Sequence, residues 1–287
     1  MKNILKICIV LFSGFSLIVI PSCDIHYDNT VSTEQAINIM NQGAQGVTIF
    51  KDITNQGINV ARYSDDSLLN RQIRESVVKD PYPSLSIEPY DNETWPKTIT
   101  MNYGPVNHLC PDMRERRGKL IITATDLFEN SGAEYTVSFE NFYQSNYHIQ
   151  GQLTITNLGK NDQNKTEYDI SASDIRVNTP KANTFYYNQN TTRTWEEGEG
   201  TSLDYEDDVY YITGEQYGYS SDSVRYDMSI SEKNPLDIWV KCRWIRAGNL
   251  TIEVETISDI SLDFGDGECN NYATATYDGE EYIINMD

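Results

Sequence analysis

The segment Tyr135-Thr-Val-Ser-Phe139 places a large apolar or aromatic side chain at every second position. Successive side chains of a β-strand point to opposite faces of the sheet, so a period of two predicts a strand with one buried face. The segment Gln152-Leu-Thr-Ile-Thr156 repeats the alternation. The chain also contains 20 Tyr residues, a type favoured in strands. These observations predict a β-rich protein.

Similar short apolar or alternating runs extend along the rest of the chain, at 99–103, 120–124, 208–213, 223–230, 238–244, 250–254, 260–264 and 281–284. Clusters of Gly, Asn or Asp separate them at intervals of about 8–15 residues, as expected for strands joined by turns. That spacing favours an antiparallel sheet over alternating strands and helices. We therefore expect residues 95–287 to form one mostly β domain, either β-sandwich-like or an extended antiparallel sheet.

A helical period precedes this domain at residues 32–61. Ser32-Thr-Glu-Gln35 has the form of a capping box, in which the Ser hydroxyl and the Gln side chain satisfy free amides at a helix start. Apolar residues then recur at helical spacing, and Gly43 and Gly46 are expected to weaken the end of this run before a second helical stretch at 47–61. The sequence thus predicts a short N-terminal helical segment.

Polar segments flank the helical region. Residues 23–31 are short and polar, as in a tether, and residues 62–94 are rich in charge, Ser and Pro, as in a linker. Within the β domain, residues 98–125 and 259–285 share a weak internal repeat, a strand ending in an aromatic residue and Gly and followed by a Cys. We interpret the repeat as two related hairpin units, with chance similarity in a Tyr-, Asn- and Gly-rich β protein as the alternative.

The N-terminus has the organisation of a targeting segment. Lys2 and Lys6 form a basic region, and residues 7–20 are uncharged and mostly apolar. Fourteen residues span about 21 Å as a helix, short of the roughly 30 Å hydrocarbon core of a membrane. Pro21 would also interrupt a helix. We expect residues 1–22 to be a signal peptide, with a membrane span as the alternative.

Ile20-Pro-Ser-Cys23 resembles a bacterial lipobox, with Pro21 departing from the usual pattern. The small residue before the Cys gives a peptidase access, and the thiol accepts diacylglycerol. The resemblance implies that Cys23 is a lipid anchor carrying acyl chains such as palmitate, which bind membranes far more strongly than a single chain. An ordinary signal peptide with an incidental Cys is the alternative.

A further resemblance covers residues 97–287. It rests on an ordered set of short motifs: NYG at 102–104 with Cys110, RRGKLIIT at 116–123, FENFY at 139–143, GQLTITN at 151–157, RTW at 193–195, YITG at 211–214, CRW at 242–244 and DFGDG at 263–267. Together they resemble a family of uncharacterised Bacteroidetes-type lipoproteins. The resemblance implies an extracytoplasmic β-rich domain and no particular activity. Asp24 directly after Cys23 signals inner-membrane retention in enteric bacteria, a rule that need not hold in the lineage to which this resemblance points. In such a lineage, Asp24 and Asp28 near the mature terminus favour the outer membrane over the inner membrane.

The charge balance excludes one class of partner. The 287-residue chain has 22 Lys and Arg against 43 Asp and Glu, a net charge of −21. No basic patch is available to neutralise phosphates, so nucleic-acid binding is not expected. This charge also repels anionic head groups, so contact with the membrane is expected through the lipid anchor.

Cysteine positions give no metal or cofactor pattern. Cys8 lies in the signal peptide and Cys23 is the lipidation position, which leaves Cys110, Cys242 and Cys269. Outside the cytoplasm two of these three can pair, and the sequence leaves open which two. Their spacings match no zinc site, so we predict neither metal nor cofactor.

Two acidic segments are candidate cation sites. Asp263-Phe-Gly-Asp-Gly-Glu268 could wrap Ca²⁺, but three oxygens are too few, and a tight turn with Gly at positive φ is the favoured interpretation. Residues 196–208 hold seven acids in thirteen positions. A patch for divalent ions or a cationic partner is conceivable there, and we favour a solvated acidic loop.

Tyrosines supply the candidate binding residues. Tyr186, Tyr187, Tyr217 and Tyr219 offer flat rings on which a sugar can stack. Neighbouring residues in a strand point to opposite faces, so half of such rings are expected in the core, and core packing is the main alternative. These four residues are nevertheless the best candidates for an exposed platform.

Catalytic motifs are absent from the sequence. The three His residues show no metal-ligand spacing, and there is no nucleophile elbow, phosphate loop or dinucleotide fingerprint. We predict no catalytic residues and a non-catalytic envelope protein that binds or scaffolds, with a glycan or an envelope protein as partner. The alternative is a carbohydrate-active hydrolase, which would show two carboxylates about 5–10 Å apart in a concave cleft.

Overall fold

The computed structural model describes residues 30–62, 82–91, 93–201 and 204–286. The predicted signal peptide, Cys23 and most of the predicted tether lie outside these ranges, as do residues 63–81 of the predicted linker. Within them, no helix is both apolar and long enough to span a bilayer.

The described residues form one long α-helix and fifteen β-strands, in agreement with the predicted mostly β class. The elements in chain order are α1 (Thr33–Arg62), β1 (Ser84–Glu88), β2 (Lys97–Asn102), β3 (His108–Leu109), β4 (Glu115–Ala124), β5 (Glu134–Gln144), β6 (Tyr147–Lys160), β7 (Thr166–Asn178), β8 (Thr184–Glu197), a 3₁₀ turn (Tyr205–Asp207), β9 (Val209–Tyr219), β10 (Arg225–Ile230), β11 (Leu236–Trp239), β12 (Ala247–Glu253), β13 (Ile260–Asp266), β14 (Tyr272–Tyr277) and β15 (Glu280–Asn285).

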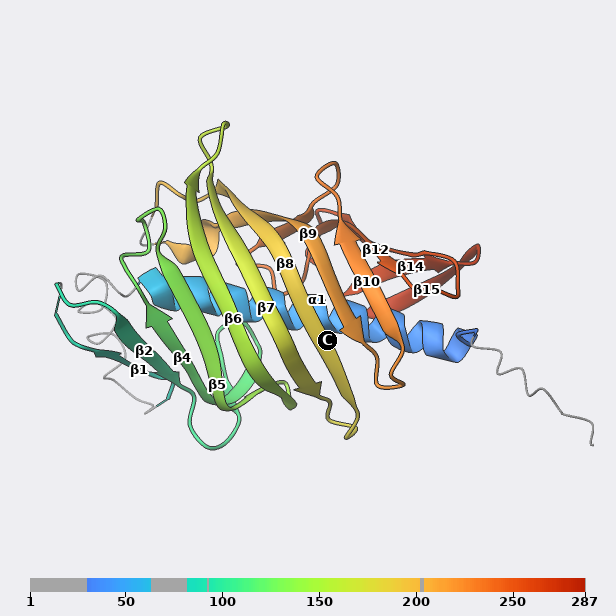
Figure 1. Ribbon diagram of the computed structural model, residues 1–287, viewed down its shortest axis with the longest axis horizontal. Coiled ribbons are helices and arrows are strands. Elements are labelled where there is room, and N and C mark those ends of the chain that lie inside the picture. The colour runs from blue at the N-terminus through green and yellow to red at the C-terminus, as the bar shows by residue number, and fades with distance from the viewer. Residues whose placement is uncertain (1–29, 63–81, 92, 202–203, 287) are drawn as a thin grey trace, which may run out of the picture.

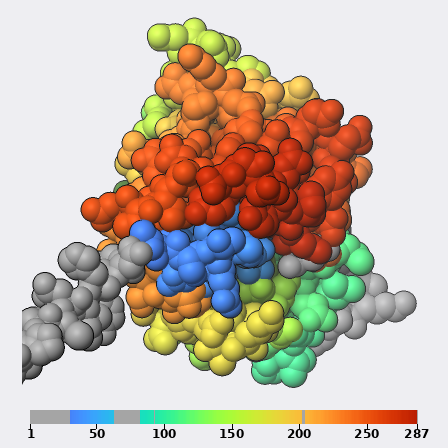
Figure 2. Space-filling model, turned by 90° about the vertical axis from the view of Figure 1, so that its right-hand side faces the viewer, coloured from blue at the N-terminus to red at the C-terminus, as the bar shows by residue number. Residues whose placement is uncertain are grey.

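All strands belong to a single antiparallel sheet in which neighbours in sequence are mostly neighbours in space. The order is β1-β2-β4-β5-β6-β7-β8-β9-β10-β12-β13-β14-β15, with β3 paired to β4 and β11 paired to β9 and β12. Figure 1 shows α1 crossing this strongly twisted sheet behind β4 to β10. In Figure 2 the N-terminal part of α1 lies between the C-terminal strands and the yellow and green segments. The sheet therefore curls around the helix, which gives a sandwich-like cross-section.

The helix begins at the predicted capping box. The backbone amide of Ser32 donates to Gln35 Oε1 at 2.9 Å, and the amide of Gln35 donates to Ser32 Oγ at 3.2 Å. These bonds satisfy amides that have no partner inside the helix. The capping-box prediction is confirmed.

Glycines do not interrupt the helix, which corrects the expectation of a short, broken segment. α1 runs for 30 residues through Gly43 and Gly46. A Cβ added to Gly46 would lie 2.7 Å from Cδ2 of Tyr187 on β8, and one added to Gly57 would lie 3.0 Å from Ile155 on β6. Glycine is needed because the helix backbone approaches the sheet this closely, and tertiary contacts outweigh its low helix propensity.

The helix is the centre of the core and not a separate segment before the β domain. Every residue from 46 to 55 is buried, including polar Lys51, Asp52 and Asn55. A helix buried on all sides normally carries apolar residues all round. The polar residues of α1 must therefore find partners inside the protein.

Part of the predicted linker is a strand. Residues 84–88 form β1, which pairs with β2 from Ser84 opposite Asn102 to Glu88 opposite Thr98. β1 is an edge strand with mostly exposed side chains, so its sequence can be polar and rich in Pro. That composition is also typical of a linker, which is why the strand was not predicted.

The cysteines follow the predicted scheme in part. Cys242 and Cys269 form a disulfide that joins the loop before β12 to the loop after β13. Cys110 is free and buried, and burial raises the pKa of its thiol. The two segments of the proposed internal repeat contain β2 to β4 in one case and β13 to β15 in the other, but their cysteines differ in state.

Candidate functional site

Three of the four candidate tyrosines lie together on the outer face of the sheet. Tyr186 on β8 and Tyr217 and Tyr219 on β9 are 43%, 40% and 40% exposed. The strand period explains this placement, because alternate residues of β8 and β9 face outward, away from α1. We call Tyr186, Tyr217, Tyr219 and Arg225 the tyrosine surface.

The strand register brings these side chains side by side. Tyr219 pairs with Tyr186 across β8 and β9, and with Arg225 across β9 and β10. Tyr217 lies two residues along β9 on the same face. Side chains directly opposite or diagonal in adjacent strands are within contact distance. The three rings and the guanidinium therefore form a continuous surface across three strands.

Arg225 is held at the edge of this surface. Its guanidinium carbon lies 5.0 Å from the ring centre of Tyr217, within range of a cation–π contact. Its Nη2 donates to Asp227 Oδ1 at 2.6 Å and its Nε donates to Asp227 Oδ2 at 3.1 Å. Hydrogen bonds to Asp227 and Tyr219 raise the pKa of Arg225 above its ordinary value. Arg225 thus offers a fixed, charged donor beside the rings.

A groove adjoins the tyrosine surface. It has a volume of about 870 Å³ and lies where β10, the end of β12 and the start of α1 meet. Arg225 and Asp227 line it, together with Glu253, Glu255 and Asp259. Asp227 pairs with Glu253 across β10 and β12. The site therefore combines stacking faces with many hydrogen-bonding groups.

Tyr187, the fourth candidate, is not part of this surface. Its side chain is fully buried and stacks on Phe50 of α1, with ring centres 4.7 Å apart and planes 11° apart. Its hydroxyl donates to Gln189 Oε1 at 3.1 Å, and burial raises the pKa of Tyr187 well above its ordinary value. The expectation that Tyr187 belongs to an exposed platform is wrong, because the register turns it toward the helix.

The acidic run at 196–208 is not a uniformly solvated loop. Asp208 is fully buried and pairs with Arg62 at 2.5 Å at the end of α1. Its Oδ1 accepts a hydrogen bond from Trp195 Nε1 at 3.1 Å, and Arg62 lies 4.7 Å from the Trp195 ring. Such a pair lowers the cost of burying each charge. The run therefore contains an anchor for the helix end.

The glycine-rich acidic segment is not the predicted tight hairpin turn, because Asp263 to Asp266 form the end of β13, where the register against β12 shifts. Its glycines do have the predicted positive φ. Asp263 Oδ1 accepts a hydrogen bond from the amide of Gly265 at 2.8 Å, and Gly265 and Gly267 have φ of 95° and 115°. The described residues contain no group of three or more His, Cys, Asp or Glu able to hold a metal ion.

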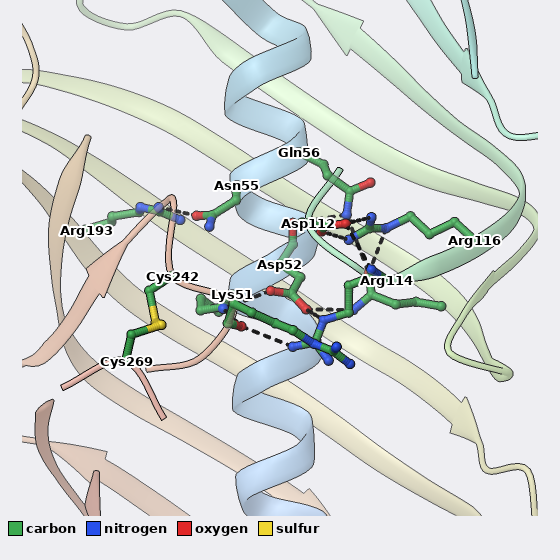
Figure 3. Close-up of polar contacts among 12 residues, drawn as sticks. Lys51, Asp52, Asn55, Gln56, Asp112, Arg114, Arg116, Arg193, Cys242 and Cys269 are labelled. Atoms are coloured by element: carbon green, nitrogen blue, oxygen red, sulfur yellow. Dashed lines mark hydrogen bonds and ion pairs between the residues drawn. A yellow bond between two sulfur atoms is a disulfide. The ribbon is translucent and has the colours of Figure 1, made fainter. Parts of the chain in front are cut away.

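A buried network of charged and polar side chains surrounds the middle of α1 (Figure 3). Asp52 lies at its centre, 2.9 Å from Lys51 Nζ and 2.8 Å from Arg114 Nε. Gln144 Nε2 also donates to Asp52 at 2.9 Å. Burial lowers the pKa of Lys51, although Asp52 acts in the opposite direction. One carboxylate thus serves two buried cations.

The network continues from the helix into the loop before β4. Gln144 Oε1 accepts from Arg116 Nε at 3.0 Å, and Arg116 forms two hydrogen bonds to Asp112 at 2.7 and 2.5 Å. Lys51 and Arg114 both donate to the carbonyl of Arg243, in the loop before β12. The members of this network other than Asp112 and Arg243 have buried side chains that use each other as partners. We therefore interpret the network as fixing α1 and two loops together.

Sequence reasoning missed this network and the Arg62–Asp208 pair. Polar residues at 51, 52, 55 and 62 interrupt the apolar stripe of the helical segment. A polar interruption of a long helical pattern is the one available signal, and it identifies no partner.

No protein-family model, curated protein or solved structure matches the chain.

Proposed function

We propose that this chain is a non-catalytic lipoprotein of the cell envelope, anchored by an acylated Cys23 and binding a glycan through the tyrosine surface. The observation that supports binding is the alignment of Tyr186, Tyr219 and Arg225 across three adjacent strands. Rings in this setting present an apolar face with a polar edge, which suits a sugar ring with its alternating C–H and O–H groups.

The groove extends the platform to more than one sugar. The carboxylates of the groove can accept hydrogen bonds from sugar hydroxyl groups, and Arg225 can donate hydrogen bonds to the oxygens of those hydroxyl groups. An oligosaccharide lying on the rings would continue past Arg225 into the groove, because Arg225 belongs to both. A chain of sugars is therefore a better ligand than a monosaccharide.

A hydrolase is the second candidate, and one observation favours it. Asp227 and Glu253 lie opposite each other in a groove, as a pair of catalytic carboxyl groups would. However, Asp227 is 52% exposed and ion-paired with Arg225, whereas a general acid is typically a desolvated carboxyl group. Binding without hydrolysis is therefore the favoured proposal.

Glycan-array screening of the chain from residue 24 tests the binding proposal. We expect at least one class of oligosaccharide to bind and to be recovered intact after prolonged incubation. Release of shorter products that stops in Asp227→Asn or Glu253→Gln would establish the hydrolase instead. Failure of every glycan on the array to bind would contradict the proposed ligand class.

The anchor proposal has a separate test. Mass spectrometry of the mature N-terminus is expected to show Cys23 carrying acyl chains, in a protein that fractionates with the outer membrane. A retained Met1, or an unmodified residue at the mature N-terminus, would contradict it. Resemblance to Bacteroidetes-type lipoproteins supports the outer membrane as the location.

A further inference from the structure

Two rows of outward-facing side chains cross the sheet between β4 and β10, on the face turned away from α1 and toward the viewer in Figure 1. One row pairs, strand by strand, Gln150, Arg176, Tyr186, Tyr219 and Arg225. The adjacent row pairs Arg117, Tyr143, His148, Asn178 and Thr184. Neither row contains an Asp or Glu, although the chain has 43 acidic residues against 22 basic ones. We call these ten residues the arginine band.

Side chains of the second row contact one another. The guanidinium carbon of Arg117 lies 3.6 Å from the ring centre of Tyr143. That ring stacks on His148, with ring centres 4.4 Å apart and planes 12° apart. Asn178 Nδ2 lies 3.4 Å from His148 Nδ1. Cation–π and stacking contacts hold these side chains in place. The row therefore extends the tyrosine surface as an ordered surface, on the side away from the groove.

Arg176 connects this row to the tyrosine surface. It is exposed on β7 and lies opposite Tyr186 of β8. Burial lowers the pKa of His148, and the charges of Arg117 and Arg176 lower it further, so both guanidinium groups act on one imidazole. Among the described residues, neither Arg117 nor Arg176 forms an ion pair. The charges of these two arginines are therefore available to an anionic ligand.

We propose that the ligand of the tyrosine surface is an acidic oligosaccharide, with a carboxylate or sulfate group bound to Arg176 and a neighbouring sugar stacked on Tyr186 and Tyr219. This inference rests on the proposed function and adds the charge and the direction of the ligand. A guanidinium binds oxyanions through charge-assisted and often paired hydrogen bonds, which are stronger than those of neutral groups. An acidic sugar beside the rings thus gains more from this surface than a neutral one.

The groove determines the direction of the bound chain. Its lining includes the carboxylates of Asp227, Glu253, Glu255 and Asp259. These carboxylates repel an acidic sugar, whereas they can accept hydrogen bonds from the hydroxyl groups of a neutral one. Arg225 is ion-paired with Asp227, so it does not offset this repulsion. The acidic end of the ligand therefore lies over Arg176, and the neutral end enters the groove.

The spacing of the arginines suits a chain with more than one acidic sugar. Arg117, Arg176 and Arg225 lie on β4, β7 and β10, so successive arginines are separated by three strand spacings, or roughly 14 Å across the strands. This separation exceeds the width of one sugar ring, so each arginine contacts a different sugar. A chain that also has an acidic group over Arg117 should bind more tightly than one with a single acidic group.

The net charge of −21 does not oppose binding of such a ligand at close range. At physiological ionic strength, interactions between exposed charges are largely screened beyond about 8 Å. A ligand on the arginine band therefore experiences mainly the arginines within that distance and not the acids on the rest of the molecule.

Glycan-array screening and calorimetric titration of the chain from residue 24 test the inference. We expect the array ligands to be acidic. Neutralising the acidic groups of the tightest one, by methyl esterification of carboxylates or by desulfation, should weaken binding at least about tenfold. Arg176→Gln should weaken binding of the acidic ligand to a similar extent and leave that of the neutralised ligand unchanged. Lys241→Gln removes a positive charge from a side chain that is 60% exposed outside the arginine band, and it should change neither affinity.

NMR titration of His148 in the unaltered chain gives a second readout. An anion bound to Arg176 offsets the charges that lower the pKa of His148, so this pKa should be higher with the acidic ligand than with the neutralised one. Equal pKa values, full affinity in Arg176→Gln, or an array with only neutral ligands would overturn this inference and leave the proposed function standing. An array with no ligand at all would contradict the proposed function itself.

Discussion

Tyr186 and Tyr187 are neighbours in sequence, yet the structure assigns them opposite roles, and replacing each by Ala separates these roles. Tyr187→Ala removes a fully buried ring, which costs about 3–5 kcal/mol for a large core aromatic. Its stacking on Phe50 adds about 0.5–1.5 kcal/mol beyond the buried area. Gly46 leaves no side chain to fill the space, so the cavity would persist.

Tyr186→Ala removes a ring that is 43% exposed. The expected cost is that of one cross-strand pair with Tyr219, about 0.2–1 kcal/mol. Tyr187→Phe keeps the stacked ring and loses only the hydrogen bond to Gln189, so about 1 kcal/mol is expected.

Urea unfolding of the chain from residue 24, followed by tryptophan fluorescence, measures all three free energies. The expected order is Tyr187→Ala far above Tyr187→Phe, with Tyr186→Ala close to the unaltered chain and no change in m-value for the last two. Equal costs for the two Ala variants, or a cost below about 1 kcal/mol for Tyr187→Ala, would refute the placement of the helix against β8.

Three further predictions concern the interior and the loops. Asp52→Asn leaves two buried cations without their shared carboxylate and should lower the free energy of unfolding by about 3–5 kcal/mol in urea titrations; a loss under 1 kcal/mol would contradict the network. Burial opposes ionisation of Asp112, but hydrogen bonds and the charge of Arg116 outweigh it and lower its pKa. The contribution of Asp112 to stability is therefore complete above about pH 4 and is lost as pH falls through the lowered pKa. In that acidic range the thermal midpoint of Asp112→Asn should fall less steeply than that of the unaltered chain. Parallel curves of midpoint against pH would contradict this. Replacing Cys242 and Cys269 by Ala removes a disulfide with a sequence separation of 27 residues and should lower the free energy of unfolding by about 3–4 kcal/mol. Reducing the disulfide of the unaltered chain should lower it by the same amount.

Local patterns predicted the β-structure well, because along one strand the side chains alternate between the core and the solvent, and a few consecutive residues are enough to show this alternation. Residues Tyr135 to Phe139 lie in β5 and residues Gln152 to Thr156 in β6, and the two strands pair with Tyr135 opposite Ile155. The start of the helix was predictable for a similar reason, since a capping box involves only four consecutive residues.

The position of the helix depends on contacts far apart in sequence, and these were not predictable. From the sequence alone Gly46 predicts a weak helix, because only the fold brings it against the ring of Tyr187. Asp208 resembled the other acids of its run, although Arg62 lies 2.5 Å from it. Likewise, alternation predicted that one ring of a neighbouring pair is buried, but only the register identifies Tyr187 as that ring.

The central claim is that the tyrosine surface binds a glycan, and calorimetric titration of the tightest array ligand tests it most directly. The double variant Tyr217→Ala and Tyr219→Ala should weaken binding by at least about tenfold per ring while leaving the urea midpoint nearly unchanged. Tyr272→Ala provides the matched control, since Tyr272 is 50% exposed on β14 and lies outside the tyrosine surface. Affinity lost in the double variant and kept in the control is the predicted result. Equal affinity in the unaltered chain, the folded double variant and the control would contradict the account.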